Sequence, residues 1–127
     1  MFVVDFPWAR PAAKGATTEV FMELTSVGGG ALVGARSDFS RRVDLVGPGA
    51  SGKPVERLAL PAAAPVILAP GSYRVRIAAI DRTLKQGDWV PVVLIVEAAD
   101  GSRQEIALQA EVRRRSALDD HLHGHRH

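Results

Sequence analysis

Cysteine is absent from this 127-residue chain, and histidine is absent from its first 120 residues. Without cysteine the chain can form neither disulfides nor thiolate metal sites. Without histidine, the body of the chain has no Ser/His or Cys/His pair for nucleophilic catalysis. The carboxylates of Asp38, Asp44, Asp81 and Asp88 lie in or beside predicted turns, where aspartate bonds to its own local backbone. These features argue against an enzyme.

Long apolar runs are also missing: none approaches the roughly 18 residues that a membrane-crossing helix needs. The opening segment is too short for a signal peptide and is interrupted by Asp5 and Pro7, so an exported form would carry its signal peptide before residue 1. The net charge is only +2, and the 16 cationic side chains are scattered among 14 acidic ones. This pattern does not predict a nucleic-acid partner.

Period-two alternation is the dominant positive signal. In residues 17–26, Val20, Met22 and Leu24 alternate with polar or aromatic neighbours, which predicts a strand with Met22 in the core. Further short apolar runs, separated by Gly- and Pro-rich turns, occupy residues 31–37, 41–47, 65–81 and 88–113. Pro70-Gly71 and Asp100-Gly101 predict turns within the last two of these. Seven or eight such strands favour an antiparallel β-sandwich or barrel.

The chain divides into residues 1–112, the predicted β domain, and residues 113–127, an Arg- and His-rich segment without periodicity that we expect to be a mobile tail. Within the domain, the segment GPGASGK at 47–53 matches the spacing of a phosphate-binding loop. Pro54 follows it instead of Ser or Thr, and no helix is predicted after it, so we interpret it as a strand connection. Trp8 and Trp89 are predicted to pack in the core or at an edge rather than to form a stacking platform.

Four segments of the domain stand in a characteristic order: WARP (8–11), GGALVGARSDFSRRVDL (29–45), LAPGSYRV (68–75) and LKQGDWVPVVLIVEAADG (84–101). Together they resemble the periplasmic copper chaperones of the PCuAC type, and the resemblance spans residues 3–112 in order. It implies a cupredoxin-like, Greek-key β-sandwich without enzymatic activity. It also implies an exported, periplasmic protein that handles copper(I) for a copper enzyme or another copper-handling protein.

The copper ligands of that family are two histidines and two methionines, and none is present at the matching positions. One histidine falls on Val46, the other histidine and one methionine fall on Arg74 and Arg76, and the last methionine falls near Ser51. Two fixed positive charges would repel a copper ion. We therefore predict that no metal binds the domain body. On an exposed strand face Arg74 and Arg76 would instead bind an anion or a partner's carboxylates, unless they are solvated or paired with nearby acids.

The tail supplies the imidazoles that the domain lacks. His121, His123, His125 and His127 alternate along residues 121–127, and nitrogen donors suit copper(II) or zinc. The leading hypothesis is a copper-homeostasis protein that has lost the usual copper(I) site and binds metal, if at all, through this tail. The alternative is an interaction module that binds no metal and uses the Arg74/Arg76 face. A third hypothesis is dimerisation through an edge strand, with metal bridging two tails.

Overall fold

The computed structural model describes residues 1–114, which contain nine β-strands and no helix. The strands are β1 (Phe2–Ala9), β2 (Thr18–Ser26), β3 (Gly30–Arg36), β4 (Arg42–Val46), β5 (Leu58–Leu60), β6 (Val66–Leu68), β7 (Arg74–Ala78), β8 (Trp89–Ala98) and β9 (Arg103–Val112). The predicted all-β class is confirmed. None of the described residues forms a helix that could cross a membrane.

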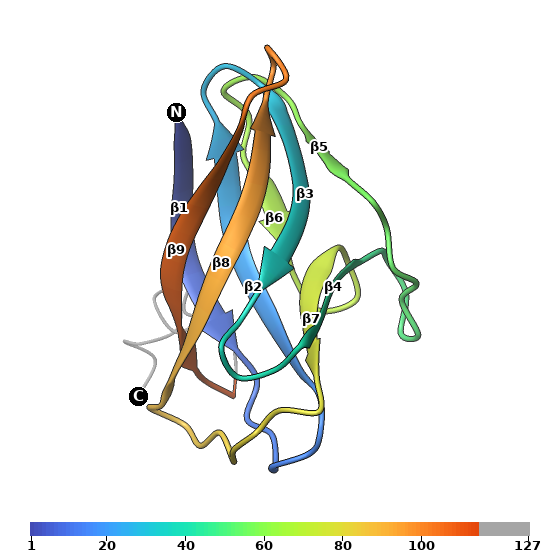
Figure 1. Cartoon of the computed structure of the whole chain (residues 1–127), viewed down its shortest axis with the longest axis vertical. Coiled ribbons are helices and arrows are strands. Elements are labelled where there is room, and N and C mark those ends of the chain that lie inside the picture. Colours follow the sequence, from blue (N-terminus) through green and yellow to red (C-terminus); the bar gives the residue numbers. More distant parts are fainter. Residues whose placement is uncertain (115–127) are drawn as a thin grey trace, which may run out of the picture.

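The strands form one continuous sheet that curls on itself, with β8 and β9 in front of β2 in Figure 1. The strand order is β4-β7-β2-β1-β9-β8-β3-β5, and β6 pairs with β2 beside β7. Curling places the apolar faces of the two halves of the sheet against each other, which is the packing of a β-sandwich. One pairing departs from the antiparallel expectation: β1 and β9 run parallel at Trp8–Glu111 and Ala9–Val112. Periodicity gives the faces of strands but not the direction of pairing between distant ones.

The core is built by the alternating apolar positions. On β8, Val90, Val92, Leu94 and Val96 are each at most 1% exposed, while the side chains between them are half-buried. They pack in one cluster with residues of β2 and β7, and Met22 belongs to this cluster as predicted. Burial of each such aliphatic side chain contributes roughly 1.5–3 kcal/mol to the free energy of folding. The four side chains of β8 are therefore a large part of what stabilises the sandwich.

Two strands were not predicted from the sequence, and each has a local reason. In β1 the register shifts between Asp5 and Trp8, and Phe6 adopts a positive φ of 52°, so the alternation is broken. β5 has only three residues, too few for a period to be recognised. A similar irregularity occurs at Ala79, which has a φ of 50°. Strict alternation would place Ile80 on the same face as Arg74 and Arg76, but the turn at Ala79 directs Ile80 into the core.

The last described strand ends at Val112, and residues 115–127 lie outside the described part of the chain. The predicted division at residue 112 stays a prediction, as does everything proposed for the tail.

Candidate functional site

Strands β4 and β7 bring together the positions at which the resemblance places copper ligands. Val46 lies directly opposite Arg74, and Arg76 follows two residues later on β7. Opposite residues of an antiparallel pair point to the same face. The neighbouring pair, Leu45 and Val75, packs in the core. Val46 and Arg74 therefore point to the outer face of the sheet.

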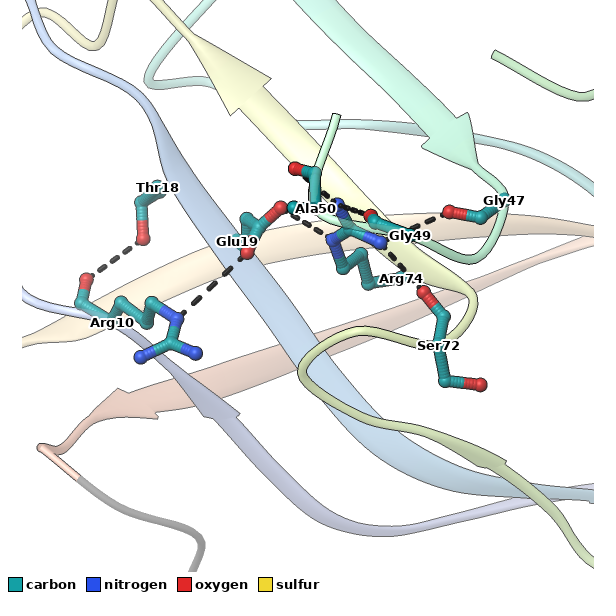
Figure 2. Close-up of polar contacts among 8 residues, drawn as sticks. All are labelled: Arg10, Thr18, Glu19, Gly47, Gly49, Ala50, Ser72 and Arg74. Carbon is teal, nitrogen blue, oxygen red and sulfur yellow. Dashed lines mark hydrogen bonds and ion pairs between the residues drawn. The ribbon is translucent and has the colours of Figure 1, made fainter. Parts of the chain in front are cut away.

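The guanidinium of Arg74 is enclosed on that outer face, and each of its five N–H groups has an acceptor. Nε donates to the carboxylate of Glu19 at 2.5 Å (Figure 2). The other four N–H groups donate to backbone carbonyl oxygens: Nη1 to Gly47 and Ser72 at 3.0 and 2.7 Å, and Nη2 to Gly49 and Ala50 at 2.9 and 3.5 Å. We call this arrangement of Glu19, loop 47–53 and Ser72 around the guanidinium the Arg74 cage.

The cage explains how a charged side chain can be 2% exposed. An isolated buried charge costs many kcal/mol, and it is tolerated only when paired and fully hydrogen-bonded. Glu19 supplies the opposite charge, and the loop carbonyls satisfy the donors that the carboxylate does not reach. Arg74 is thereby the central contact between loop 47–53 and the sheet.

Glu19 reaches the cage from β2, the strand on the other side of β7. It lies opposite Arg76 in the β2–β7 ladder, and its second oxygen faces Arg10 Nε at 3.8 Å. Arg10 in turn is tied to the start of β2, because the Thr18 hydroxyl donates to its carbonyl oxygen at 2.7 Å (Figure 2). Sequence reasoning did not single out Glu19. The available signal was its place on the outward face of β2, which it shares with Phe21 and Glu23, residues that form no such cage.

Loop 47–53 is shaped around a cation rather than an anion. A phosphate loop directs backbone N–H groups inward, whereas three carbonyl oxygens of this loop point at the Arg74 guanidinium. Gly52 lies so close that a Cβ there would be 2.9 Å from Arg74 Nη2 and 2.9 Å from the Gly47 carbonyl oxygen. A glycine is therefore needed at position 52 for the loop to close.

The expected arginine face needs correction. Arg74 is not exposed, and its five donors are all used within the chain, so it cannot bind an external anion or carboxylate. Arg74 is instead paired with a nearby acid, Glu19, which was the other possibility that the sequence left open. Arg76 remains partly exposed, with one long contact of 3.4 Å from Nη2 to the Ser51 carbonyl oxygen. The two arginines lie on the same outer face but do not form a pair of solvent-exposed charges.

The chemistry of the cage does not suit copper(I). This ion prefers thiolate, thioether and imidazole donors, and here the positions expected to carry them hold valine, two arginines and a serine. Met22 belongs to the core cluster. No group of three or more His, Cys, Asp or Glu that could hold an ion occurs among residues 1–114. His121, His123, His125 and His127 lie outside the described residues.

Comparison with known proteins now assigns the chain to a family. The family model LpqE-like, which describes a class of lipoprotein, matches residues 2–112. The chain belongs to the LpqE-like family. Comparison with curated protein sequences finds no match.

Solved structures similar to this LpqE-like chain are PCuAC domains. The apo PCuAC domain of PmoF1 has a TM-score of 0.74 at 19% identity, covering 90% of this chain and 94% of that one. The copper-bound PCuAC domain of PmoF2 has a TM-score of 0.71 at 22% identity, covering 90% and 93%. The copper(I) form of DR1885 from Deinococcus radiodurans has a TM-score of 0.60 at 28% identity, covering 87% and 78%. The predicted resemblance and cupredoxin-like sandwich are confirmed, and the assignment is to a non-enzymatic family.

The tryptophans of this LpqE-like protein do not stack on each other. Trp8 is buried, with its ring centroid 4.5 Å from that of Phe21. The guanidinium carbon of Arg10 lies over the Phe21 ring, 5.3 Å from its centroid. Trp89, at the start of β8, is 56% exposed. Both are in register with Glu111 on β9, so a whole strand separates them.

Proposed function

We propose that this LpqE-like protein is a non-enzymatic, exported protein of copper homeostasis or delivery in which the copper(I) site of the PCuAC fold has been replaced by the Arg74 cage. One observation carries the proposal: a guanidinium, held by Glu19 and loop carbonyls, fills the place where the resemblance expects imidazole and thioether ligands. Copper is bound in two of the similar solved structures, the PmoF2 PCuAC domain and DR1885.

Arg74 opposes a metal ion in the same place. The Glu19 carboxylate offsets its charge, but the guanidinium fills the space and is held there by five hydrogen bonds, so a metal ion would have to displace it. The carbonyl oxygens of the loop offer no compensation, because they already accept hydrogen bonds from Arg74. Any metal held by this protein would then be bound by the tail histidines, and delivery would be to a copper enzyme or another copper-handling protein.

The test is copper(I) competition against a strong chelator, using a chain that ends at Arg115 and so keeps all nine described strands. We expect this chain to retain no copper(I). The variant Val46→His, Arg74→His, Arg76→Met, made in the same background, removes both guanidiniums and supplies donors, and we expect it to gain affinity. One equivalent of copper(I) retained by the unsubstituted domain would contradict the proposal.

The interaction-module alternative loses one of the two arginines on which it relied, because Arg74 is enclosed. The copper(II) stoichiometry of the full chain, compared with that of the chain ending at Arg115, separates the two hypotheses. We expect metal to bind the full chain only.

A further inference from the structure

An apolar groove lies on the outer face of the sandwich, away from the Arg74 cage. It is a shallow groove with a volume of about 70 Å³ between β1 and β6, with Phe6 and Trp8 on one side, Ile67 and Pro70 on the other, and Glu23 of β2 between them. We call it the β1–β6 groove. Two of its lining side chains are apolar and exposed, Phe6 at 45% and Ile67 at 59%. Val3, two residues before Asp5 on the same face of β1, is 38% exposed. Exposed apolar side chains gathered on one face mark interaction sites.

The carboxylate of Glu23 lines this groove and that of Asp5 lies beside it, and within residues 1–114 no cation forms an ion pair with either. Asp5 of β1 and Glu23 of β2 are direct cross-strand partners, and Ile67 is the partner of Glu23 on the other side. Like charges directly opposite each other in a sheet destabilise it. Within residues 1–114 neither carboxylate takes part in an ion pair or a side-chain hydrogen bond. Glu19, four residues before Glu23 on β2, differs because it contacts two arginines.

Phe6 adds an independent observation. Its φ of 52° is a costly conformation for a residue with a side chain, and the register shift of β1 occurs around it. The strain projects an aromatic ring into the lining of the groove instead of into the core. Strained backbone conformations are enriched at ligand-binding and active sites.

We propose that the β1–β6 groove binds an extended segment of a partner polypeptide in which an arginine or lysine lies between apolar residues. The basic side chain pairs with Glu23 and Asp5 and lies against the Phe6 ring, where a cation is also attracted by the aromatic face. The apolar neighbours cover Ile67, Pro70 and Val3. Charge complementarity selects this occupant, because an acidic or neutral segment would leave both carboxylates facing each other uncompensated. The inference is independent of how, or whether, the protein binds copper.

The experiment uses the full chain and an array of synthetic peptides of 12 or 13 residues. In one set arginine or lysine alternates with leucine or valine, in a matched set glutamate replaces the basic residue, and one further peptide corresponds to residues 115–127. We expect binding to the basic set only, weakening as salt is added. Glu23→Gln should weaken it by about tenfold or more. Phe6→Gly, which keeps the backbone conformation but removes the ring, should weaken it severalfold without unfolding the domain.

The control is Glu56→Gln, which removes an exposed carboxylate that has no partner among the described residues and lies outside the groove. It should bind the basic peptides as the unsubstituted chain does. Equal binding of acidic and basic peptides, no binding of either, or an unchanged affinity in Glu23→Gln would overturn the proposal. Binding of the 115–127 peptide alone would also overturn it, because the occupant would then be the chain's own tail.

Discussion

At the scale of single residues, Arg74 determines how loop 47–53 is held. Replacing it with methionine keeps much of its volume but leaves the Glu19 carboxylate and four carbonyl oxygens without their donor. Removing one partner of a buried ion pair costs about 3–5 kcal/mol. We therefore expect Arg74→Met to lower the free energy of unfolding by about that amount in urea denaturation.

The matched control for that variant is Arg36→Met. Arg36 also forms a bidentate pair, with Glu105, but both side chains are 54% exposed. Exposed pairs contribute about 0–1 kcal/mol, so Arg36→Met should change stability little. Equal losses in the two variants would show that the cage is not what stabilises the loop.

Gly52 tests the same cage from the loop side. In Gly52→Ala the new methyl group would lie 2.9 Å from both Arg74 Nη2 and the Gly47 carbonyl oxygen, so the loop must shift. Overpacking of this kind costs about 1–3 kcal/mol, and we expect the thermal midpoint to fall. Gly28→Ala, where a Cβ would meet nothing within 4 Å, is the comparison that should leave the midpoint nearly unchanged. A loss as large at Gly28 would contradict the close approach at Gly52.

At the scale of elements, Glu97 of β8 links the β8–β9 hairpin to the segment just before β5. This carboxylate contacts Arg57 at 3.2 Å and its cross-strand partner Arg103 at 3.3 Å. The hydrogen bond from Arg57, and then the one from Arg103, hold the pKa of Glu97 below its usual value. A carboxylate whose folded pKa is depressed stabilises the fold above its unfolded pKa of about 4.3, and this contribution is lost as pH falls through the folded pKa.

The prediction concerns that pKa. In an NMR titration of side-chain carboxyl carbons, Glu97 should titrate below the ordinary glutamate value, and Arg57→Gln should raise its pKa more than Arg103→Gln does. The order follows from the larger effect of Arg57. An unshifted Glu97 in the unsubstituted protein, or no rise in Arg57→Gln, would mean that these surface contacts are not formed in solution.

The same scale shows what the sequence could predict. Regular alternation identifies β2, β8 and β9, because every second residue of these strands packs inward. Alternation fails for β1, which is interrupted at Phe6, and for the three residues of β5. The resemblance drew attention to Arg74, but the burial of this residue depends on Glu19, a residue 55 positions earlier that only the strand order β7-β2 brings beside it. A strand pattern carries no such long-range information.

At the scale of the whole molecule, the core and the histidines belong to different parts of the chain. All buried apolar residues of the described part lie between Trp8 and Val112, whereas every histidine is at or after residue 121. A metal bound by the histidines would therefore be expected to add little to the stability of the sandwich. Metal binding and folding should be separable in this protein.

The tail prediction follows from that separation. If the full chain binds metal, copper(II) or zinc should be held by His121, His123, His125 and His127, because nitrogen donors favour these ions. Protons compete for the same nitrogens with pKa values near 6.5, so affinity should fall steeply as pH decreases from about 7 to 5. Calorimetric titration with copper(II) at these two pH values measures the effect. The variant with all four histidines replaced by alanine should bind no metal at either pH. Undiminished stoichiometry in that variant would place the metal site in the domain and remove the basis for assigning the tail a role in copper handling.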